Sequence, residues 1–336
     1  MDPPRAKNDD EQRRTNNMKR VMVIDALNLF LRSYIVNPTI SKEGQPIGGT
    51  AGFLKSLQKL CREMRPDNIV VCWDGRGGSR RRKQKNKNYK EGRAPVRLNR
   101  SIRTLSEEEE KDNKIWQMYR TFEYLNNFPI IQLVADEVEA DDLISYICQY
   151  SQYKGWEKVI VSSDKDFFQL LDGTTILHRP IQKRYLNKKN IVEEYGIHPL
   201  NFALARAIAG DQSDNLSGVG GVGLKTISKR FPFFAEERSV LLSELIEFCE
   251  NQNQKIKAFD TICEERQLVK DNYALMQLYT SSLSPQTQQT IDWTIKNFQY
   301  TFNKTQTDLM MFEDGIIDNV WSDLITSFKR IRKNEA

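Results

Sequence analysis

The sequence predicts an α/β fold with a mostly parallel central sheet flanked by helices. Two observations support this prediction. Three short apolar runs have the continuous hydrophobic character of strands that are buried on both faces, and helical patterns separate these runs along the chain. A chain of 336 residues with 39% apolar side chains is also long enough to bury such a core.

The beginning of the chain differs from the rest in composition. Residues 1–17 are polar and charged and show no apolar period. Such a segment buries too little apolar surface to offset the entropy that it would lose on folding. We therefore predict a disordered tail over residues 1–17 and the start of folded structure near Met18.

Each of the three predicted strands ends in an aspartate. The runs cover residues 21–24, 69–73 and 159–163, and they are followed by Asp25, Asp74 and Asp164. In an open parallel sheet the ligand lies outside the carboxyl ends of the strands. The sequence therefore predicts that these three carboxylates converge at one edge of the sheet.

Helical patterns occupy residues 52–64, 107–125 and 141–153, between the strands. After Gly210 the sequence becomes glycine-rich and then helical to its end. Residues 236–336 contain no motif that we can interpret.

A basic segment follows the second strand. From Arg76 to Arg103 the chain contains twelve Lys or Arg residues and a single acid, Glu91, before an acidic run at residues 107–110. A solvated, disordered basic loop would have this composition. Because the segment begins two residues after Asp74, we favour a basic insertion that projects from the sheet beside the acidic site.

Six further acids lie in three short clusters. Asp166 lies two residues past Asp164, another cluster opens the third helix, and the last pair is three residues apart; they are Asp166, Glu139, Asp141, Asp142, Asp211 and Asp214. Helix N-termini favour carboxylates, so the cluster at the third helix could consist of simple capping residues. Capping does not explain why three buried strands also end in aspartate.

Nine carboxylates in one place would raise one another's pKa unless cations offset the repulsion. The five cysteines form no Cys-x-x-Cys pair, and the chain has only two histidines, so a zinc site is improbable. Carboxylate oxygens favour Mg²⁺ or Mn²⁺. Two such ions about 4 Å apart would generate hydroxide and stabilise both the attacking and the leaving oxygen of a phosphodiester.

A glycine-rich segment covers residues 218–226 and contains a Gly-x-Gly-x-x-Gly pattern. A dinucleotide site is improbable because no apolar strand precedes the pattern. We interpret the segment as a turn between two short helices whose backbone amides approach a DNA phosphate, with a plain glycine-rich connector as the alternative. The residues expected to contact DNA are Gly218, Gly220, Gly221, Gly223, Lys225 and Thr226.

Composition also bears on location. The chain contains 50 Lys and Arg residues against 45 Asp and Glu residues, for a net charge of +5. No apolar run approaches the roughly 20 residues that cross a bilayer. An odd number of cysteines without a signal peptide indicates a reducing cytoplasm.

In order and spacing, these segments resemble the 5′ nuclease superfamily, which includes flap endonucleases and the 5′ nuclease domain of bacterial DNA polymerase I. The resemblance covers roughly residues 19–235, and the stand-alone phage enzymes are the most similar in size. The matching segments are Val23-Ile24-Asp25, Cys72-Trp73-Asp74, Tyr89-Lys90-Glu91-Gly92-Arg93, Val138-Glu139-Ala140-Asp141-Asp142, Ser163-Asp164-Lys165-Asp166, Gly210-Asp211-Gln212-Ser213-Asp214-Asn215 and the glycine turn.

The resemblance implies a division of the chain. Residues 18–200 would form the α/β nuclease core of a PIN-like fold, including a basic helical arch at about residues 76–112. Residues 201–336 would form a helical region with a helix-hairpin-helix motif at about residues 205–235. This motif often holds a monovalent cation, typically K⁺. Ser217 stands where polymerase-type members commonly have proline.

The resemblance also implies roles for single residues. Lys90 and Arg93 match basic residues of the arch that neutralise the scissile phosphate, and Tyr89 could stack on a base. Arg32 matches a phosphate-contacting position. One metal position would involve Asp25, Asp74, Glu139, Asp141 and Asp142, and the other Asp164, Asp166, Asp211 and Asp214, with Asp164 able to serve both.

The function implied is a Mg²⁺-dependent, structure-specific 5′ nuclease, with Mn²⁺ as a possible substitute. It would act as a flap endonuclease and 5′-3′ exonuclease, with RNase H-type primer removal, during DNA replication and repair. The expected partners are DNA with 5′ flaps or ends and RNA–DNA hybrid, and we expect a monomer in the cytoplasm of a bacterium or a phage-infected host.

Two alternatives come from other classes. A non-catalytic DNA-binding protein on the same fold would be expected to lack some of the carboxylates, and none is missing. A phosphatase of the haloacid dehalogenase type needs an Asp-x-Asp pair after the first strand. Asp25 is followed by Ala26 and Leu27, so this alternative fails.

Overall fold

The computed structural model describes residues 18–102, 104–149, 151–252, 256–280, 282–316 and 322–335. The predicted disordered tail, residues 1–17, lies outside the described residues. None of the described helices combines the length and the apolar character that crossing a bilayer requires.

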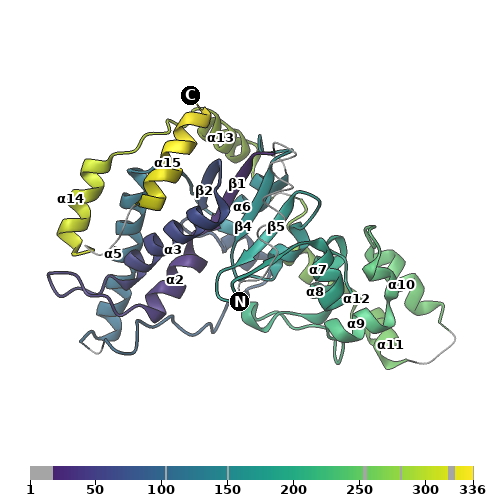
Figure 1. Cartoon of the computed structure of the whole chain (residues 1–336). Coiled ribbons are helices and arrows are strands. Elements are labelled where there is room, and N and C mark those ends of the chain that lie inside the picture. Colours follow the sequence, from purple (N-terminus) through teal and green to yellow (C-terminus); the bar gives the residue numbers. More distant parts are fainter. Residues whose placement is uncertain are drawn as a thin grey trace.

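The core is a six-stranded sheet with the strand order β3-β2-β1-β4-β5-β6 (Figure 1). Strands β1 to β5 are parallel and β6 is antiparallel to β5, which confirms the predicted mostly parallel sheet. The strands are β1 (Arg20–Asp25), β2 (Asn68–Cys72), β3 (Ile131–Leu133), β4 (Glu157–Val161), β5 (Thr175–Arg179) and β6 (Arg184–Leu186).

Strand β1 occupies the centre of the sheet, and all six of its residues are buried. It pairs with β2 on one side and with β4 on the other, so the chain leaves β1 in one direction and later returns to its opposite edge. This reversal of strand order is the place where open α/β sheets bind ligands. Asp25, the last residue of β1, lies at this point.

Helices cover both faces of the sheet (Figure 1). Met22 and Ile24 of β1 point to one face, and Val21 and Val23 point to the other, as the alternation along a strand requires. The first face packs against α2 (Ala26–Val36), α3 (Gly48–Met64), α5 (Glu107–Asn126), α14 (Lys304–Asp314) and α15 (Ser322–Glu335). The second packs against α6 (Ala140–Gln149), η1 (Asp166–Leu170), α7 (Lys188–Tyr195), α8 (Pro199–Ala209) and α13 (Pro285–Lys296).

The three helices expected from the sequence are present, with shifted ends. Helix α3 starts four residues before the predicted start at Gly52, and α6 ends four residues before Tyr153. The Ser151 hydroxyl donates to the carbonyl of Ile147 at 2.7 Å and accepts the N–H of Tyr153, so it replaces the next helical bond and turns the chain.

The basic insertion contains little helix. Among its described residues only α4 (Arg80–Lys85) is an α-helix, and the rest consists of turns and extended chain. The insertion ends at α5, where Ser106 and Glu109 form a capping box and the first turn is acidic.

The helices after residue 200 lie in different parts of the molecule. Helix α12 (Arg266–Met276) packs against α8, whereas α14 and α15 return to the face of α3 and α5. There the Asp314 carboxylate accepts hydrogen bonds from Arg120 at 2.8 Å and from Tyr124 at 2.6 Å. The predicted domain division at residue 200 stays a prediction.

Helix α8, the connection that contains η2 (Gln212–Asp214) and the glycine turn, and α9 (Leu224–Arg230) form a helix-turn-helix arrangement. A Cβ atom at Gly218 would lie 2.2 Å from the carbonyl of Ala209, so only glycine allows this close approach. Val219 and Val222 are buried and hold the turn against the core. Beyond α9, the helices η3 (Pro232–Ala235), α10 (Leu242–Glu250) and α11 (Lys257–Glu264) share a cluster of phenylalanine rings.

Candidate active site

The carboxyl ends of β1, β2 and β4 bring three aspartates together. Asp25 ends β1, Asp74 lies two residues after the end of β2, and Asp164 lies three residues after the end of β4. The register pairs Asp25 with Cys72 and Ile24 with Val161, so the three strands end at the same level. Besides burial, the charges of Asp74 and Asp164 raise the pKa of Asp25, as expected for carboxylates at one edge of the sheet.

Asp25 is buried at the end of the central strand, with 7% of its surface exposed. Its carboxylate accepts hydrogen bonds from the Asn28 N–H at 3.1 Å and from the Ser162 hydroxyl at 2.9 Å. Burial outweighs these two bonds and raises the pKa of Asp25 from 3.8 to about 7. A carboxyl group whose pKa is raised in this way can release its proton when a metal ion binds.

Asp74 and Asp141 extend the cluster toward α6. The Asp74 carboxylate accepts the backbone N–H of Ala140 at 2.8 Å, so it caps the start of α6 and fixes the position of the next residue, Asp141. Burial and the charge of Glu139 raise the pKa of Asp74. Burial and the charge of Asp164 raise the pKa of Asp141 well above its ordinary value.

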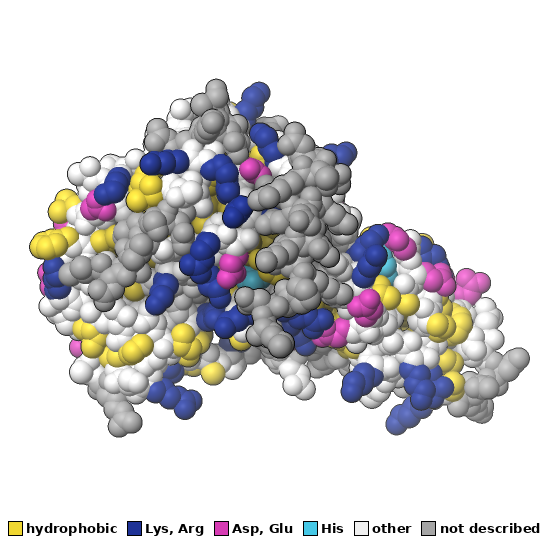
Figure 2. All heavy atoms as spheres, in the orientation of Figure 1, with side chains coloured by type: hydrophobic (Ala, Val, Ile, Leu, Met, Phe, Trp, Pro, Cys, Tyr) yellow, Lys and Arg dark blue, Asp and Glu magenta, His cyan; other side chains and the backbone are white. Residues whose placement is uncertain are grey.

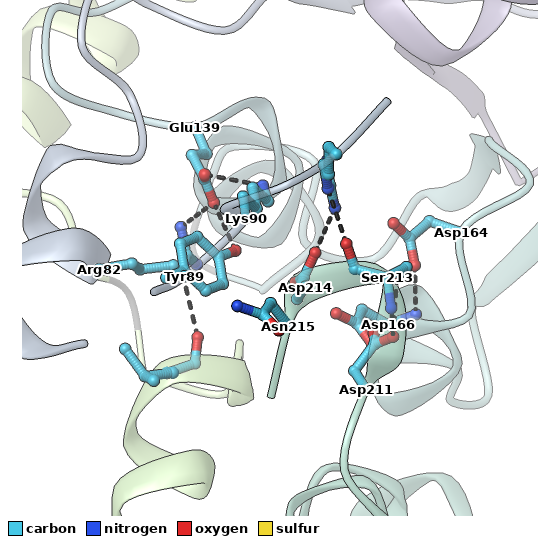
Figure 3. Close-up of polar contacts among 12 residues, drawn as sticks. Arg82, Tyr89, Lys90, Glu139, Asp164, Asp166, Asp211, Ser213, Asp214 and Asn215 are labelled. Atoms are coloured by element: carbon cyan, nitrogen blue, oxygen red, sulfur yellow. Dashed lines mark hydrogen bonds and ion pairs between the residues drawn. The ribbon is translucent and has the colours of Figure 1, made fainter. Parts of the chain in front are cut away.

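A second group of acids lies beside the first. Carboxylate oxygens of Asp166, Asp211 and Asp214 lie within 4.8 Å of one another (Figure 3). Arg206 of α8 pairs with both Asp166, at 3.1 Å, and Asp211. Burial and the charge of Asp164 still raise the pKa of Asp166 to about 7, although Arg206 opposes this shift.

Two cations from the basic insertion bind acids of the α6 segment. Arg82 donates to Glu139 and, with two nitrogens at 2.9 and 3.2 Å, to Asp142. Lys90 donates to Glu139 at 2.8 Å (Figure 3). Burial alone would lower the pKa of Lys90, but Glu139 and Asp141 outweigh burial and raise it, so Lys90 is cationic at neutral pH.

The backbone of Lys90 ties the insertion to the second group of acids. Its N–H donates to the carbonyl of Asp214 at 2.9 Å, and its φ of 57° is uncommon for a residue that has a Cβ atom. Arg93 donates to the Asp214 carboxylate and to the Ser213 carbonyl, the latter at 2.8 Å. The insertion therefore lies over both groups of acids.

Tyr89 has a different environment from the one we expected. Its side chain is 4% exposed and packs against Leu216, Leu275 and Met276, with its hydroxyl 3.4 Å from Glu139. A ring buried in this way has no free face for a base, so the expected stacking is not the arrangement in this structure. Tyr89 instead anchors the insertion to the core.

A family model described as "5′-3′ exonuclease, N-terminal resolvase-like domain" matches residues 20–196, which is more than half of the chain. The chain belongs to the 5′-3′ exonuclease family. The 5′-3′ exonuclease of Buchnera aphidicola is 30% identical over 211 residues, covering 62% of this chain and 68% of the relative. That of Aquifex aeolicus is 29% identical over 212 residues, with the same two coverages.

DNA polymerase I of Thermus aquaticus is 31% identical over 212 residues, covering 62% of this chain but only 23% of the polymerase. The chain thus spans about a quarter of the length of its polymerase relatives. A solved structure of the bacteriophage T5 flap endonuclease with DNA and metal ions has a TM-score of 0.68 and 20% identity, covering 83% of this chain and 99% of that one. The T5 5′-exonuclease with bound zinc has a TM-score of 0.67 and 19% identity over the same shares. At this identity the likeness shows the shared fold.

Within this member of the 5′-3′ exonuclease family, the predicted acids form one connected cluster. Charge interactions link Asp25 to Asp74 and Asp164, and Asp164 to Asp141 and Asp166. Glu139 and Asp142 join through Arg82, and Asp211 joins Asp166 through Arg206. These oxygen-only side chains fit divalent metal ions, which would offset the burial and the repulsion that raise the carboxyl pKa values.

Two predicted DNA contacts lie outside this cluster. Arg32 is half-buried on α2. Burial and the charges of Lys59 and Arg32 lower the pKa of His178, which lies on β5, to about 4. The glycine turn follows the second group of acids directly. Figure 2 shows Lys and Arg side chains spread over both halves of the face it draws.

Two functional residues were missed from the sequence. Arg82 lies among eleven other basic residues of the insertion, so nothing in composition distinguishes it. Arg206 lies five residues before Asp211 in a helix with no other charged residue, and this isolated charge in a largely buried helix was the available signal.

The raised pKa values predict how metal binding depends on pH. Asp25 and Asp166 have a pKa of about 7 in the folded protein against 3.8 ordinarily, so their contribution to stability is full below about pH 4 and is lost as pH rises through about 7. A divalent ion binds the ionised carboxylates and should reverse this loss. We expect the rise in melting temperature caused by Ca²⁺, relative to EDTA, to be larger near pH 8 than near pH 5. An equal rise at both pH values would contradict the assignment of these acids.

Proposed function

We propose that this chain is a Mg²⁺-dependent, structure-specific 5′ nuclease with 5′-flap endonuclease and 5′-3′ exonuclease activity. The observation that carries the proposal is the basic insertion lying directly over a cluster of repelling carboxylates at the carboxyl edge of the sheet. This combination offers metal ligands and phosphate-neutralising cations in one place. RNase H-type primer removal, with RNA–DNA hybrid as substrate, is part of the same proposal.

The acids divide into two metal positions in this proposal. The set that surrounds α6 and the ends of β1 and β2 would hold one ion, and the set that surrounds η1 and η2 would hold the other. The first consists of Asp25, Asp74, Glu139, Asp141 and Asp142, and the second of Asp164, Asp166, Asp211 and Asp214. When bound, two Mg²⁺ or Mn²⁺ ions supply a hydroxide nucleophile and stabilise the leaving oxygen.

Lys90 and Arg93 would neutralise the scissile phosphate. Both are paired with carboxylates of the cluster, Lys90 with Glu139 and Arg93 with Asp214. A metal ion bound to those carboxylates would weaken both pairs by competing for the same oxygens. The two cations would then be available to a phosphate, whose charge grows toward the transition state.

The glycine turn would bind the backbone of the DNA duplex. Cβ atoms built at Gly220, Gly221 and Gly223 meet nothing within 4 Å, so a phosphate has room to reach the backbone, and Lys225 is exposed beside them. Such contacts position the duplex without reading its sequence and weaken steeply with salt. A K⁺ ion bound by carbonyls of this turn, and an Arg32 contact to a phosphate, complete the proposed DNA interface.

Two alanine substitutions separate DNA binding from folding in this turn. We expect Gly220→Ala to keep the melting temperature, since its Cβ meets open space, and to weaken flap binding about ten-fold if one phosphate bond is lost. Gly218→Ala should instead destabilise the fold by about 1–3 kcal/mol because of its clash with Ala209. Fluorescence anisotropy with a labelled flap and thermal melting measure the two effects. Unchanged binding by Gly220→Ala would remove this part of the turn from the interface.

The proposed function is tested by cleavage of end-labelled substrates. Flap, nicked and RNA-primed duplexes should be cleaved with Mg²⁺ and remain intact with EDTA. The alternative, a non-catalytic protein that binds DNA structures, predicts binding to the flap with no cleavage under either condition.

We further propose that the protein acts as a monomer in the cytoplasm of a bacterium or a phage-infected host.

A further inference from the structure

A short segment outside the matched family region contacts the basic insertion, α6, η1, α8 and the residue before the glycine turn. This segment, which we call the brace, consists of residues 272–278, the last five residues of α12 and the two that follow. Helix α12 lies beside α8 (Figure 1). The sequence of the brace contains no acidic or basic side chain, so its contacts depend on amide groups and apolar packing.

The first contact joins the brace to α8 and to the glycine turn. Asn272 is 3% exposed, and its side-chain NH₂ group donates to the carbonyl of Ala207 at 3.0 Å and to the carbonyl of Ser217 at 2.8 Å. Ala207 lies in the last turn of α8, where carbonyls have no helical partner. Asn272 therefore holds the two ends of the segment that contains Asp211 and Asp214.

The second contact joins the brace to the basic insertion. The carbonyl of Leu275, in the last turn of α12, accepts a hydrogen bond from Arg82 at 3.0 Å. Cations are favoured at this negative end of a helix. The same guanidinium group binds Glu139 and Asp142, and the side chains of Leu275 and Met276 pack on Tyr89.

The third contact joins the brace to η1 through Gln169. This buried side chain donates to the carbonyls of Met276, at 3.1 Å, and of Asp166, at 2.8 Å, and it accepts the N–H of Leu278 at 2.7 Å. The carbonyl of Leu278 also accepts hydrogen bonds from α6, at 2.5 Å from Ser145 and at 2.8 Å from Gln149. The brace therefore contacts both α6, which follows Glu139, and η1, which contains Asp166.

We infer that the brace is a positioning element that holds the acid-bearing segments at the spacing that divalent ions require. The inference rests on the proposed function. Acids that repel one another push their segments apart when no metal ion is bound, and the brace adds neutral contacts to the core packing and to the few cations that pair with these acids. Ordinary core packing would not require that hydrogen bonds from one segment reach α4, α6, η1 and α8.

The experiment compares Asn272→Ala and Gln169→Ala with Gln267→Ala. Gln267 is an exposed amide on the same helix as Asn272 and bonds only locally, to Asp271 at 2.8 Å, which makes it a matched control. Binding of Mn²⁺ without DNA, followed by electron paramagnetic resonance, is the direct measurement. Outer-sphere supports of this kind change metal affinity by about ten-fold or more, so we expect weaker Mn²⁺ binding of that size in both variants and none in the control.

Cleavage gives a second measurement. Both variants should need about ten-fold more Mg²⁺ for half-maximal flap cleavage, and saturating Mg²⁺ should restore most of kcat with little change in KM for DNA. A merely structural role would lower the active fraction at every Mg²⁺ concentration. Wild-type Mn²⁺ affinity in both folded variants overturns the inference. A wild-type protein that binds no divalent ion overturns the proposed function instead.

Should both variants fail to fold, hydrogen exchange of the wild-type protein decides the matter. Addition of Ca²⁺ should slow exchange of the Leu278 amide, which bonds to Gln169, although the brace contains no metal ligand. Unchanged exchange across the brace on metal binding would show that it is not coupled to the acids and would overturn the inference.

Discussion

Replacing Asp141 with Asn is expected to abolish Mg²⁺-dependent cleavage of a 5′ flap, with a loss of about a thousand-fold in kcat, equivalent to about 4 kcal/mol. Burial and the charge of Asp164 raise the pKa of Asp141, and the bond from the Ala140 N–H to Asp74 fixes its position at the start of α6. An amide removes one anionic ligand while nearly keeping the shape of the side chain. Rapid-quench measurement of single-turnover cleavage gives the effect on the chemical step.

Binding and folding must remain intact for this result to be informative. Asp141→Asn and Asp164→Asn should both bind flap DNA in Ca²⁺ with nearly the wild-type affinity. Asp260→Asn, on the exposed surface of α11, is the matched control and should cleave normally. Full activity in both site variants would refute the two-metal assignment.

The second large effect is expected from Lys90→Ala, which should lower kcat by about a hundred-fold and change KM much less. Lys90 is held over the acids through its ion pair with Glu139 and through its backbone bond to Asp214, so its charge is in place before DNA binds. Its interaction with the phosphate should strengthen as negative charge develops. Steady-state cleavage across a range of flap concentrations separates kcat from KM.

Lys87→Ala is the control for the loss of a positive charge in the same insertion, since Lys87 is exposed. It should reduce binding slightly and only at low salt, where phosphate attraction is least screened. Equal kcat for Lys90→Ala and Lys87→Ala would remove Lys90 from the mechanism.

The strand-end aspartates could be predicted from the sequence because they follow from a local pattern. An apolar run identifies a strand buried on both faces, and parallel strands end at one edge, so Asp25, Asp74 and Asp164 had to meet once the sheet formed. The acids of α6 and η2 followed from short spacings of the same kind. These are properties of residues close together in sequence.

The burial of Tyr89 could not be predicted in this way. Its partners Leu216, Leu275 and Met276 lie more than a hundred residues later in the chain, and nothing near Tyr89 indicates that they cover its ring. Residues 236–336 had no interpretable motif for the same reason. Their contacts with the site come from backbone carbonyls at and just after the end of α12, from the Asn272 amide and from apolar side chains, and none of these forms a motif.

Local patterns of apolar residues and charge were enough to predict β1, β2 and β4, the edge at which the acids collect and the basic insertion beside it. Strands β3, β5 and β6 were not predicted. The pairing of each cation with its acids follows from the three-dimensional arrangement and not from local patterns. Arg82 reaches Asp142 across 60 residues, and Arg206 bridges Asp166 and Asp211 from a third segment. Such pairing depends on how helices pack around the sheet, since charge interactions act over a few ångströms in space regardless of distance along the chain.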